Sequence, residues 1–440
     1  MTHPIPPREP STAHRLLVLG SMDEFVDLVT TGRDRGYEVL VADGYADGPA
    51  KAHADAAFEI DVRDINAVAS LARAQEVDGI IGSFSDVLFE SVCRGAHEAG
   101  LYAYCPLEGL PYLRDKRAMS AMFAELGVPT AAKRTVRHDH IEEDCANLRW
   151  PCVVKPVNGY GSYGISVVQS PAEVAERFDA AASVSGDADT VLVEEYDEGA
   201  EINMIGWVAA GRAYAISLAD REKCPIVAGG VPDVVRIVYP SRYAAEAAAP
   251  ATAILQQVAD YVGMEDGPLS MQFFWHPADQ TLSVCEVAGR VLGYEHELTE
   301  IGAGFSIEDA LLDLVYDRPA MRERVVAHSL DAFTGVSFVL NFHPEPSATG
   351  AVLADTSVAE GLLARDDVLV PPSMLHYRTD ETIGHGKGAK PYLARLFCHV
   401  ASRAEADALT AELFGAFSLR GTDGRELAFS ASLPGLEVAR

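Results

Sequence analysis

The sequence predicts a mixed α/β and α+β protein with an N-terminal doubly wound βαβ domain. Its 440 residues accommodate roughly three domains of ~150 residues each. Predicted strands and helices alternate up to about residue 104, which is typical of parallel βαβ units, whereas short strands and turns dominate from about residue 330. Prolines at positions 4, 6, 7 and 10 indicate a disordered start. We expect a tail and three domains, at residues 1–12, 13–112, 113–325 and 326–440.

Charge and cysteine content restrict the class of partner. The chain has 65 acidic and 35 basic residues, a formal net charge of -30, and a field of that sign repels nucleic acid and anionic membranes. Its seven cysteines are odd in number and form no C-x-x-C pair, so neither a disulfide framework nor a zinc site is indicated. No run approaches the ~18–20 apolar residues of a membrane span. We therefore expect a cytoplasmic protein that acts on small molecules.

The N-terminal domain is predicted from the alternation of buried strands and helices. Strands are expected at residues 15–20, 38–43, 77–82 and 101–104, with a helix ending near residue 35 and others at 65–75 and 87–99. Polar residues at the strand ends, Ser21, Asp43 and Ser83 to Asp86, would face the crevice in which such sheets bind ligands. For any one of them, a role as a turn former is an equally good interpretation.

A helix is predicted to begin at Lys116, with Asp115 as its N-cap and Gly127 as its C-terminal stop. A lysine in the first turn is unfavourable for the helix dipole. Its presence is weak evidence for a ligand, and an exposed surface lysine remains the alternative interpretation.

The stretch from Trp150 to Val168 reads as strand, glycine-rich loop and strand. The loop matches G-x-G-x-x-G, but a dinucleotide fingerprint requires a helix after the loop, and here a strand follows. We expect instead a hairpin flap whose glycines allow backbone N–H groups to approach phosphates, with Lys155 supplying a charge from the preceding strand. An ordinary glycine-rich hairpin with a surface lysine explains the segment about equally well.

The central domain continues with a capped helix and several strands. Ser170 begins a helix to about residue 183; the other predicted elements are strands at 190–196, 201–208, 213–218, 269–275 and 281–287 and a helix at 241–262. In the hairpin formed by the last two strands, Gln272 and Glu286 can lie opposite one another on the same face. A carboxylate in an apolar run needs a partner or a metal, and Arg290 follows Glu286 by four residues.

The C-terminal region is predicted to be an α+β domain. Helices are expected after Ser306, at 356–364 and at 402–415, and no internal repeat is found. Residues 384–390 form a glycine-rich basic loop, which we interpret as a surface loop in preference to a substrate-contacting one.

Taken in order, these motifs resemble the ATP-grasp superfamily, in particular its biotin-carboxylase and L-amino-acid ligase branch. The resemblance covers nearly the whole chain, and it implies a central two-subdomain nucleotide clamp with its lid subdomain at about residues 130–198. The stretch from His296 to Gly304 also matches that branch. The motifs that carry the resemblance are Lys116, Lys155 before a glycine hairpin, Glu194-Glu195-Tyr196, Glu201, and Gln272 with Glu286-x-x-x-Arg290.

The resemblance implies a role for each of these residues. Lys116 and Lys155 would contact the ATP phosphates under a lid formed by Gly159, Gly161, Ser162 and Gly164. Glu194, with the backbone of Glu195 and Tyr196, would read the adenine edge, and Glu201 would bind the ribose. Gln272 and Glu286 would hold Mg²⁺, with Mn²⁺ as a substitute. Arg290 would neutralise the transferred phosphoryl group, as phosphoryl transfer requires. Arg290, Gly293 and His296 would contact the substrate.

The activity that the resemblance implies is an ATP-dependent carboxylate–amine ligase. It would form an amide or peptide bond through an acyl phosphate, release ADP and phosphate, and use amino acids or small peptides. Two positions depart from the pattern, because Gln272 stands where glutamate is usual and Ala288 where asparagine is usual. Weaker binding of a second metal or loss of activity are both consequences to consider. The alternatives are a bicarbonate-phosphorylating carboxylase or carbamoyl-type enzyme and a nucleotide-binding pseudoenzyme. A homodimer is compatible with the resemblance.

Overall fold

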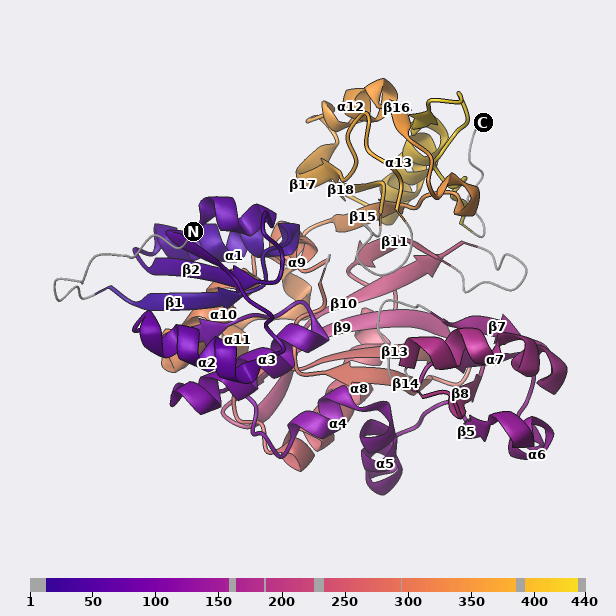
Figure 1. Cartoon of the computed structure of the whole chain (residues 1–440), viewed down its shortest axis with the longest axis horizontal. Helices are drawn as coiled ribbons and strands as arrows, with labels where there is room; N and C mark the ends of the chain where they lie inside the picture. Colours follow the sequence, from indigo (N-terminus) through magenta and orange to yellow (C-terminus); the bar gives the residue numbers. More distant parts are fainter. Residues whose placement is uncertain are drawn as a thin grey trace.

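The computed structural model describes residues 13–157, 164–185, 187–224, 233–293, 295–384 and 392–433. A parallel sheet at the N-terminus lies beside a long antiparallel sheet, to which a small lid sheet and a C-terminal domain are attached (Figure 1). The expected tail, the flap positions Gly159, Gly161 and Ser162, and most of loop 384–390 lie outside the described residues. In the described part of the chain, no helix has the length and apolar character needed to cross a membrane.

The N-terminal domain contains a four-stranded parallel sheet in the order β3-β2-β1-β4. Its elements are β1 (Arg15–Leu19), α1 (Val26–Asp34), β2 (Glu38–Asp43), β3 (Ala56–Glu59), α2 (Ile65–Ala74), β4 (Gly79–Ile81) and α3 (Asp86–Ala99).

One predicted strand of this domain is wrong. Residues 101–104 form no strand, because the chain leaves α3 at Gly100 and Tyr104 packs into the core, where its hydroxyl donates a hydrogen bond to the Gly289 carbonyl at 3.0 Å. The fourth strand is instead β3, an edge strand whose side chains alternate between half-buried and exposed. Its composition, Ala-Ala-Phe-Glu, has little of the β-branched character by which strands are recognised.

A nine-stranded antiparallel sheet forms the centre of the molecule, in the order β14-β13-β9-β10-β11-β15-β18-β17 with β12 paired to β9. Its first six strands are β9 (Ala200–Ala209), β10 (Arg212–Lys223), β11 (Val234–Tyr239), β12 (Gly267–Pro268), β13 (Ser270–His276) and β14 (Thr281–Ala288). The last three are β15 (Val336–Phe342), β17 (Leu369–Leu375) and β18 (Ala394–Val400). Because β15 is hydrogen-bonded to β11, this sheet continues across the boundary that we expected at residue 326.

The lid subdomain is a separate four-stranded sheet in the order β5-β8-β6-β7. The predicted hairpin is present, since β6 (Cys152–Lys155) pairs antiparallel with β7 (Ser166–Val168). Gly164 closes it with a φ of +70°, a conformation that favours glycine. The remaining elements are β5 (Lys133–Arg137), α6 (Ile141–Cys145), α7 (Pro171–Ser185) and β8 (Thr190–Glu195). This sheet has its own apolar cluster around Phe178 and Val193.

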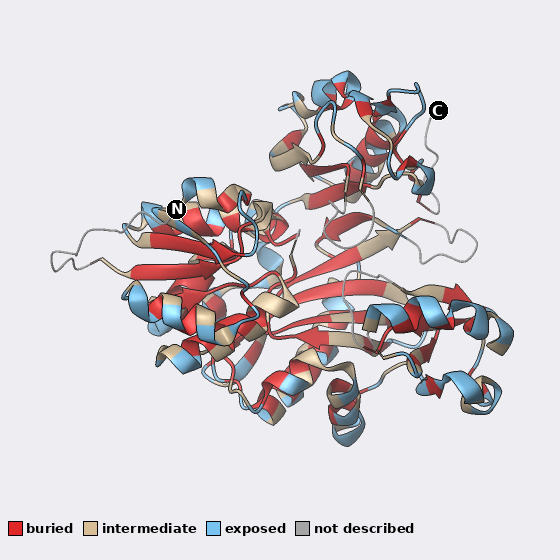
Figure 2. Cartoon of the chain, in the orientation of Figure 1, coloured by how far each residue is buried: buried red, intermediate tan, exposed pale blue. Residues whose placement is uncertain are grey.

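Helices connect and cover these sheets, and their outer faces carry the exposed residues (Figure 2). The predicted caps of α5 are present, because the Asp115 side chain accepts from the Arg117 and Ala118 N–H groups and Gly127 has a φ of +67°. The helices not yet named are α4 (Leu110–Arg114), α5 (Lys116–Leu126), α8 (Ala244–Val262), α9 (Glu297–Ala303), α10 (Ile307–Tyr316), α11 (Arg318–Ala327), α12 (Ser357–Leu363) and α13 (Arg403–Ala416). A two-stranded sheet, β16 (Leu353–Asp355) with β19 (Arg420–Gly421), completes the C-terminal domain.

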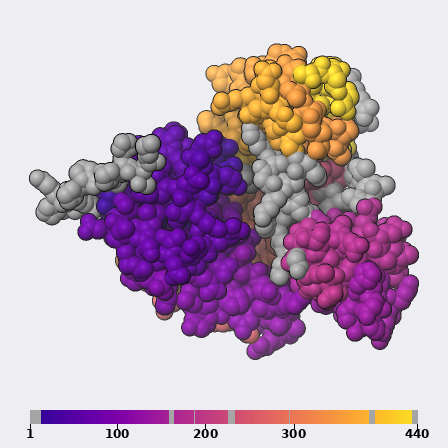
Figure 3. Space-filling model, viewed as in Figure 1, coloured from indigo at the N-terminus to yellow at the C-terminus, as the bar shows by residue number. Residues whose placement is uncertain are grey.

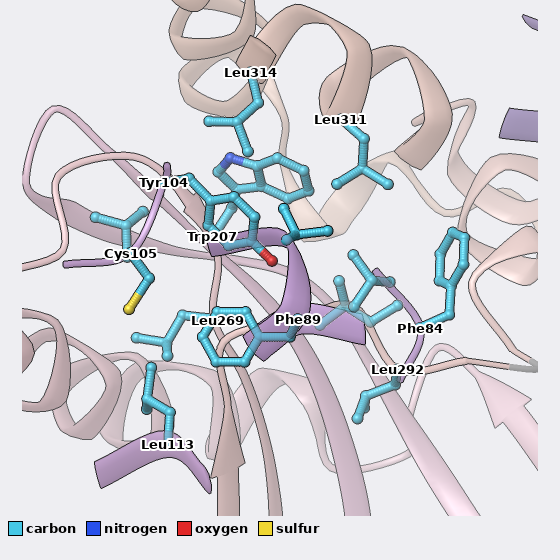
Figure 4. Packing of buried hydrophobic residues seen from close by; sticks show 14 of the residues in the cluster. Phe84, Phe89, Tyr104, Cys105, Leu113, Trp207, Leu269, Leu292, Leu311 and Leu314 are labelled. Atoms are coloured by element: carbon cyan, nitrogen blue, oxygen red, sulfur yellow. The ribbon is translucent and has the colours of Figure 1, made fainter. Parts of the chain in front are cut away.

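The N-terminal domain and the central sheet share one hydrophobic core. Phe89 and Tyr104 of the N-terminal domain lie beside Trp207 and Leu269 of the central domain (Figure 4). Trp207 is fully buried and its Nε1–H lies 3.0 Å from the Met321 sulfur. The lid subdomain and the C-terminal domain, in contrast, form separate lobes on the surface (Figure 3). The shared core fixes the N-terminal domain against one end of the central sheet.

Close packing in the central sheet predicts a cost for adding one methyl group at Gly206. A Cβ at this position would lie 2.4 Å from the Leu269 carbonyl oxygen, so the backbone of a neighbouring segment would have to move. We expect Gly206→Ala to lower the free energy of unfolding by about 1–3 kcal/mol, measured by urea denaturation. Gly361→Ala is the control, since nothing lies within 4 Å of its Cβ and a helix favours alanine. Equal stability of the two variants would contradict this packing.

Candidate functional site

Several of the predicted site residues lie on the lid sheet and on the neighbouring strands of the central sheet. Lys155 and Glu194 come from neighbouring lid strands and form an ion pair of 3.0 Å. Burial alone would lower the pKa of Lys155, but the Glu194 carboxylate more than offsets this effect, and Cys285 and Glu286 of β14 raise the pKa of Lys155 further. Because two residues of the central sheet influence its pKa, Lys155 lies near that sheet. It keeps its charge and can meet an anion there.

Glu195 lies on the opposite face of the lid strand from Glu194, as strand alternation requires. Its carboxylate accepts hydrogen bonds from the backbone N–H and the Nε–H of Arg149, both at 2.8 Å, and these bonds lower the pKa of Glu195. Its own N–H donates to Ala132, and the N–H of Tyr196 donates to Pro151. The backbone N–H groups that we expected to read an adenine edge are therefore engaged within the lid, and only the carbonyls at these two positions could serve.

Glu201 stands at the centre of a buried ion cluster. Arg221 lies 2.7 Å from its carboxylate, Lys223 forms a second ion pair, and the Gln272 amide donates to the same carboxylate at 2.5 Å. Burial would raise the pKa of Glu201, but Arg221 and Lys223 reverse the effect and lower it. Its expected contact with a ribose would have to replace one of these partners.

Two cations of this cluster, Arg221 and Lys223, were not predicted. The apolar pattern of β10 stops near Leu218, and the strand continues for five further residues that are mostly charged. Lys133 was missed for the same reason, since β5 reads Lys-Arg-Thr-Val-Arg. Lys133 lies opposite Glu194 in the sheet, and burial, partly offset by Glu194 and reinforced by Lys155, lowers its pKa.

The two residues expected to hold the metal, Gln272 and Glu286, are direct partners in the β13–β14 ladder, as predicted from the hairpin. Glu286 is half-buried, and in the part of the chain that the structure describes its carboxylate makes no hydrogen bond or ion pair. Its charge nevertheless contributes to raising the pKa of Lys155, Arg221 and Arg290, so these three cations lie within electrostatic range of it.

These residues fit a divalent cation of the Mg²⁺ type. Gln272 donates its amide N–H to Glu201, so its carbonyl oxygen remains as a hard ligand beside the free Glu286 carboxylate. Within the described ranges, no group of three or more His, Cys, Asp or Glu side chains could hold a metal alone. Mg²⁺ is commonly bound by one or two carboxylates together with phosphate oxygens and water, and this pair suits that mode.

Arg290 is held by a residue of the N-terminal domain. Its Nε–H and Nη2–H donate to the two oxygens of Asp86, at 2.8 and 3.1 Å. Burial would raise the pKa of Asp86, but Arg290, together with Arg114 and Lys116, lowers it. Lys116 therefore lies within electrostatic range of Asp86, and its contact with ATP phosphates stays a prediction. Asp86 belongs to the group of strand-end residues that we expected to face the crevice.

Gly293 and His296, expected as substrate contacts, are instead packed against the N-terminal domain. A Cβ at Gly293 would lie 2.8 Å from the Phe84 carbonyl oxygen. His296 is 1% exposed, stacks on the Phe84 ring at 4.2 Å, and forms an ion pair of 2.8 Å with Glu308. These contacts explain both residue types without a ligand. Gly293 allows the backbone to approach Phe84 closely, and the His296 imidazole contacts residues of two domains.

Comparison with known proteins supports the predicted resemblance. Residues 148–296 match the family model described as an ATP-grasp domain. The chain is 26% identical over 188 residues to a formate-dependent phosphoribosylglycinamide formyltransferase from a Nitratiruptor species, a match that covers 42% of this chain and 48% of that protein. The chain thus spans about half the length of the curated relatives it matches.

Solved structures share the fold over almost the whole chain. An L-amino acid ligase from Bacillus licheniformis superposes with a TM-score of 0.74 at 16% identity, covering 93% of this chain and 98% of that one. The biotin carboxylase domain of a Hydrogenobacter thermophilus 2-oxoglutarate carboxylase, a dimer with MgADP, ADP and bicarbonate, superposes with a TM-score of 0.70 at 15% identity, covering 93% and 92%. At such low sequence identity, the structural similarity is evidence for the fold alone. It confirms the ATP-grasp fold predicted from the sequence.

The His296 ion pair predicts a pH-dependent stability. Burial would lower the pKa of His296, but Glu297 and Glu308 raise it to about 9, above the ~6.5 of an unfolded histidine. Its stabilising contribution is complete below about pH 6.5 and is lost as the pH rises through about 9. We expect wild type to exceed His296→Gln in free energy of unfolding by up to about 3 kcal/mol at pH 6, with a smaller difference at pH 9.5. A difference independent of pH in urea titrations would show that folding does not raise the pKa of His296 and would contradict the ion pair.

Proposed function

We propose that this chain, with an ATP-grasp domain over residues 148–296, is an ATP-dependent carboxylate–amine ligase. The observation that carries the proposal is the Glu286 carboxylate, which pairs with none of the described residues although it lies opposite Gln272 and within electrostatic range of Lys155, Arg221 and Arg290. A half-buried carboxylate near three cations would ordinarily pair with one of them. A carboxylate without a protein partner is what the binding of a metal–nucleotide complex requires.

The chemistry proposed for these residues is charge neutralisation and positioning. Lys155 and Lys116 would bind the phosphates, and Glu286 with Gln272 would hold Mg²⁺. Mg²⁺, when bound, neutralises charge on the phosphate oxygens and orients them. Arg290 would neutralise the phosphoryl group as it moves from ATP to the substrate carboxylate, forming the acyl phosphate and ADP. An amine would then attack the acyl carbon, and phosphate would leave.

The relatives support a carboxylate and an amine as substrate classes. The similar proteins include a formate-dependent enzyme, an L-amino acid ligase and a carboxylase domain with bound bicarbonate, and these compounds are all carboxylates or closely related oxyacids. Near the site, the buried Glu295 and the half-buried Arg221 are the charged residues that we propose would recognise a small zwitterion. Amino acids or short peptides are accordingly the substrates that we propose.

A phosphate-release screen over pairs of amino acids tests the proposal. We expect release of phosphate from MgATP only when both a carboxylate and an amine are supplied, with the amide detected by mass spectrometry. Stimulation by bicarbonate alone would instead favour a carboxylase-type reaction. Tight ATP binding without turnover for any pair would indicate a nucleotide-binding protein, for which the neutral Gln272 is a physical reason.

Removal of the Glu286 charge should stop catalysis. Glu286→Gln keeps the shape of the side chain but removes the only unpaired carboxylate that the described residues place at the metal position. We expect phosphate release to fall about 100-fold or more, as for loss of transition-state charge stabilisation, with ADP affinity largely kept. Glu176→Gln, on the exposed side of α7, is the matched control. Wild-type rates in Glu286→Gln would remove this residue from the metal site.

Removal of the Lys155 charge should weaken nucleotide binding. Lys155→Ala deletes a half-buried ammonium of the lid sheet and leaves Glu194 without its 3.0 Å partner, so a phosphate would meet an uncompensated carboxylate. We expect ATP to bind about tenfold to 100-fold more weakly, the effect of losing a charge-assisted hydrogen bond, as measured by calorimetry. Arg177→Ala, on the outer face of α7, is the control. Unchanged affinity would place the phosphates elsewhere.

A further inference from the structure

We propose that Asp86 is a positioning residue that holds Arg290 away from Glu286, and so makes the N-terminal domain part of the catalytic site. The inference rests on the proposed ligase function. Asp86 is the first residue of α3, at the end of β4, and its carboxylate receives the Arg290 guanidinium through two parallel hydrogen bonds. Such a bidentate pair fixes both the distance and the plane of the guanidinium.

The pairing leaves part of the guanidinium free for a ligand. Arginine has five N–H donors. Asp86 receives two of them, and the Val291 carbonyl receives one from Nη1 at 3.2 Å. Two donors therefore remain, the number that bidentate binding of a phosphoryl or carboxylate group uses.

The backbone around Arg290 is seated on the N-terminal domain as well. The Val291 N–H donates to the buried Ser83 hydroxyl at 2.8 Å, and the Gly289 carbonyl accepts from the Tyr104 hydroxyl. A Cβ at Gly289 would lie 2.3 Å from the Phe89 ring, so this segment touches the N-terminal domain without a gap. The orientation of Arg290 is thus set by contacts from another domain and not by its own strand.

Without Asp86, the alternative partner for Arg290 is Glu286. Glu286 precedes Arg290 by four residues, and among the described residues its carboxylate has no hydrogen-bond or ion-pair partner. After Asp86, it is also the carboxylate that raises the pKa of Arg290 most. A guanidinium released from Asp86 would pair with Glu286, because a largely buried cation that loses its carboxylate is costly. That new pair would consume both the metal ligand and the phosphoryl-binding cation. Asp86 therefore acts on the metal position through Arg290.

Mn²⁺ binding in the presence of ADP, followed by electron paramagnetic resonance, tests this role apart from activity. We expect Asp86→Asn to bind Mn²⁺ about tenfold more weakly than wild type and to release phosphate about 100-fold more slowly. ADP affinity and the midpoint of thermal unfolding should stay close to wild type. Glu90→Gln, one turn along α3 and paired with Arg94 and Arg114, is the control and should match wild type in each measurement.

The double variant separates this proposal from a merely structural role. In Arg290→Ala no guanidinium can reach Glu286, so adding Asp86→Asn should cause no further loss, and Mn²⁺ affinity should return to within about twofold of Arg290→Ala alone. Wild-type Mn²⁺ affinity in Asp86→Asn, faster phosphate release in that variant, or a double variant as weak as Asp86→Asn would each overturn the proposal. If wild type binds no Mn²⁺ with ADP, the ligase function fails, and this inference fails with it.

Discussion

One carboxylate kept free among three cations is the feature on which the rest of this structure depends. Each cation near Glu286 is held by a carboxylate of its own, and a buried charge that lacked such a partner would pair with Glu286 instead. The three pairs are Lys155–Glu194, Arg221–Glu201 and Arg290–Asp86. Glu286 is thereby left as a ligand for a metal, and the cations are held as binding groups for the anion that accompanies it.

The fold explains why these pairs can coexist. Each comes from a different part of the molecule: the lid sheet supplies the first pair, the central antiparallel sheet the second, and the junction with the N-terminal domain the third. Of the three cations, Lys155 belongs to the lid sheet, Arg221 to β10 of the central sheet, and Arg290 to the segment that follows β14.

The sequence predicted the strands and caps well where the local chemistry was distinctive. Asp115 and Gly127 mark the two ends of one helix, and the hairpin placed Gln272 opposite Glu286. Both predictions were correct because they depend on short-range patterns. It did not predict the ends of strands made of charged residues, so Arg221 and Lys133 were missed. The sequence also did not predict which side chains of distant segments pair with one another. Asp86 was expected only to face a crevice, and its pairing with Arg290 depends on a contact across 204 positions of the chain.

The central claim is most directly tested by a crystal structure of the chain with MgADP. The account predicts a magnesium ion bound to the Glu286 carboxylate, the β-phosphate of ADP within hydrogen-bonding distance of Lys155, and Arg290 still paired with Asp86. Nucleotide bound outside the space between the lid and central sheets would contradict it. A direct ion pair between Glu286 and any of the three cations, with no metal between them, would contradict it equally.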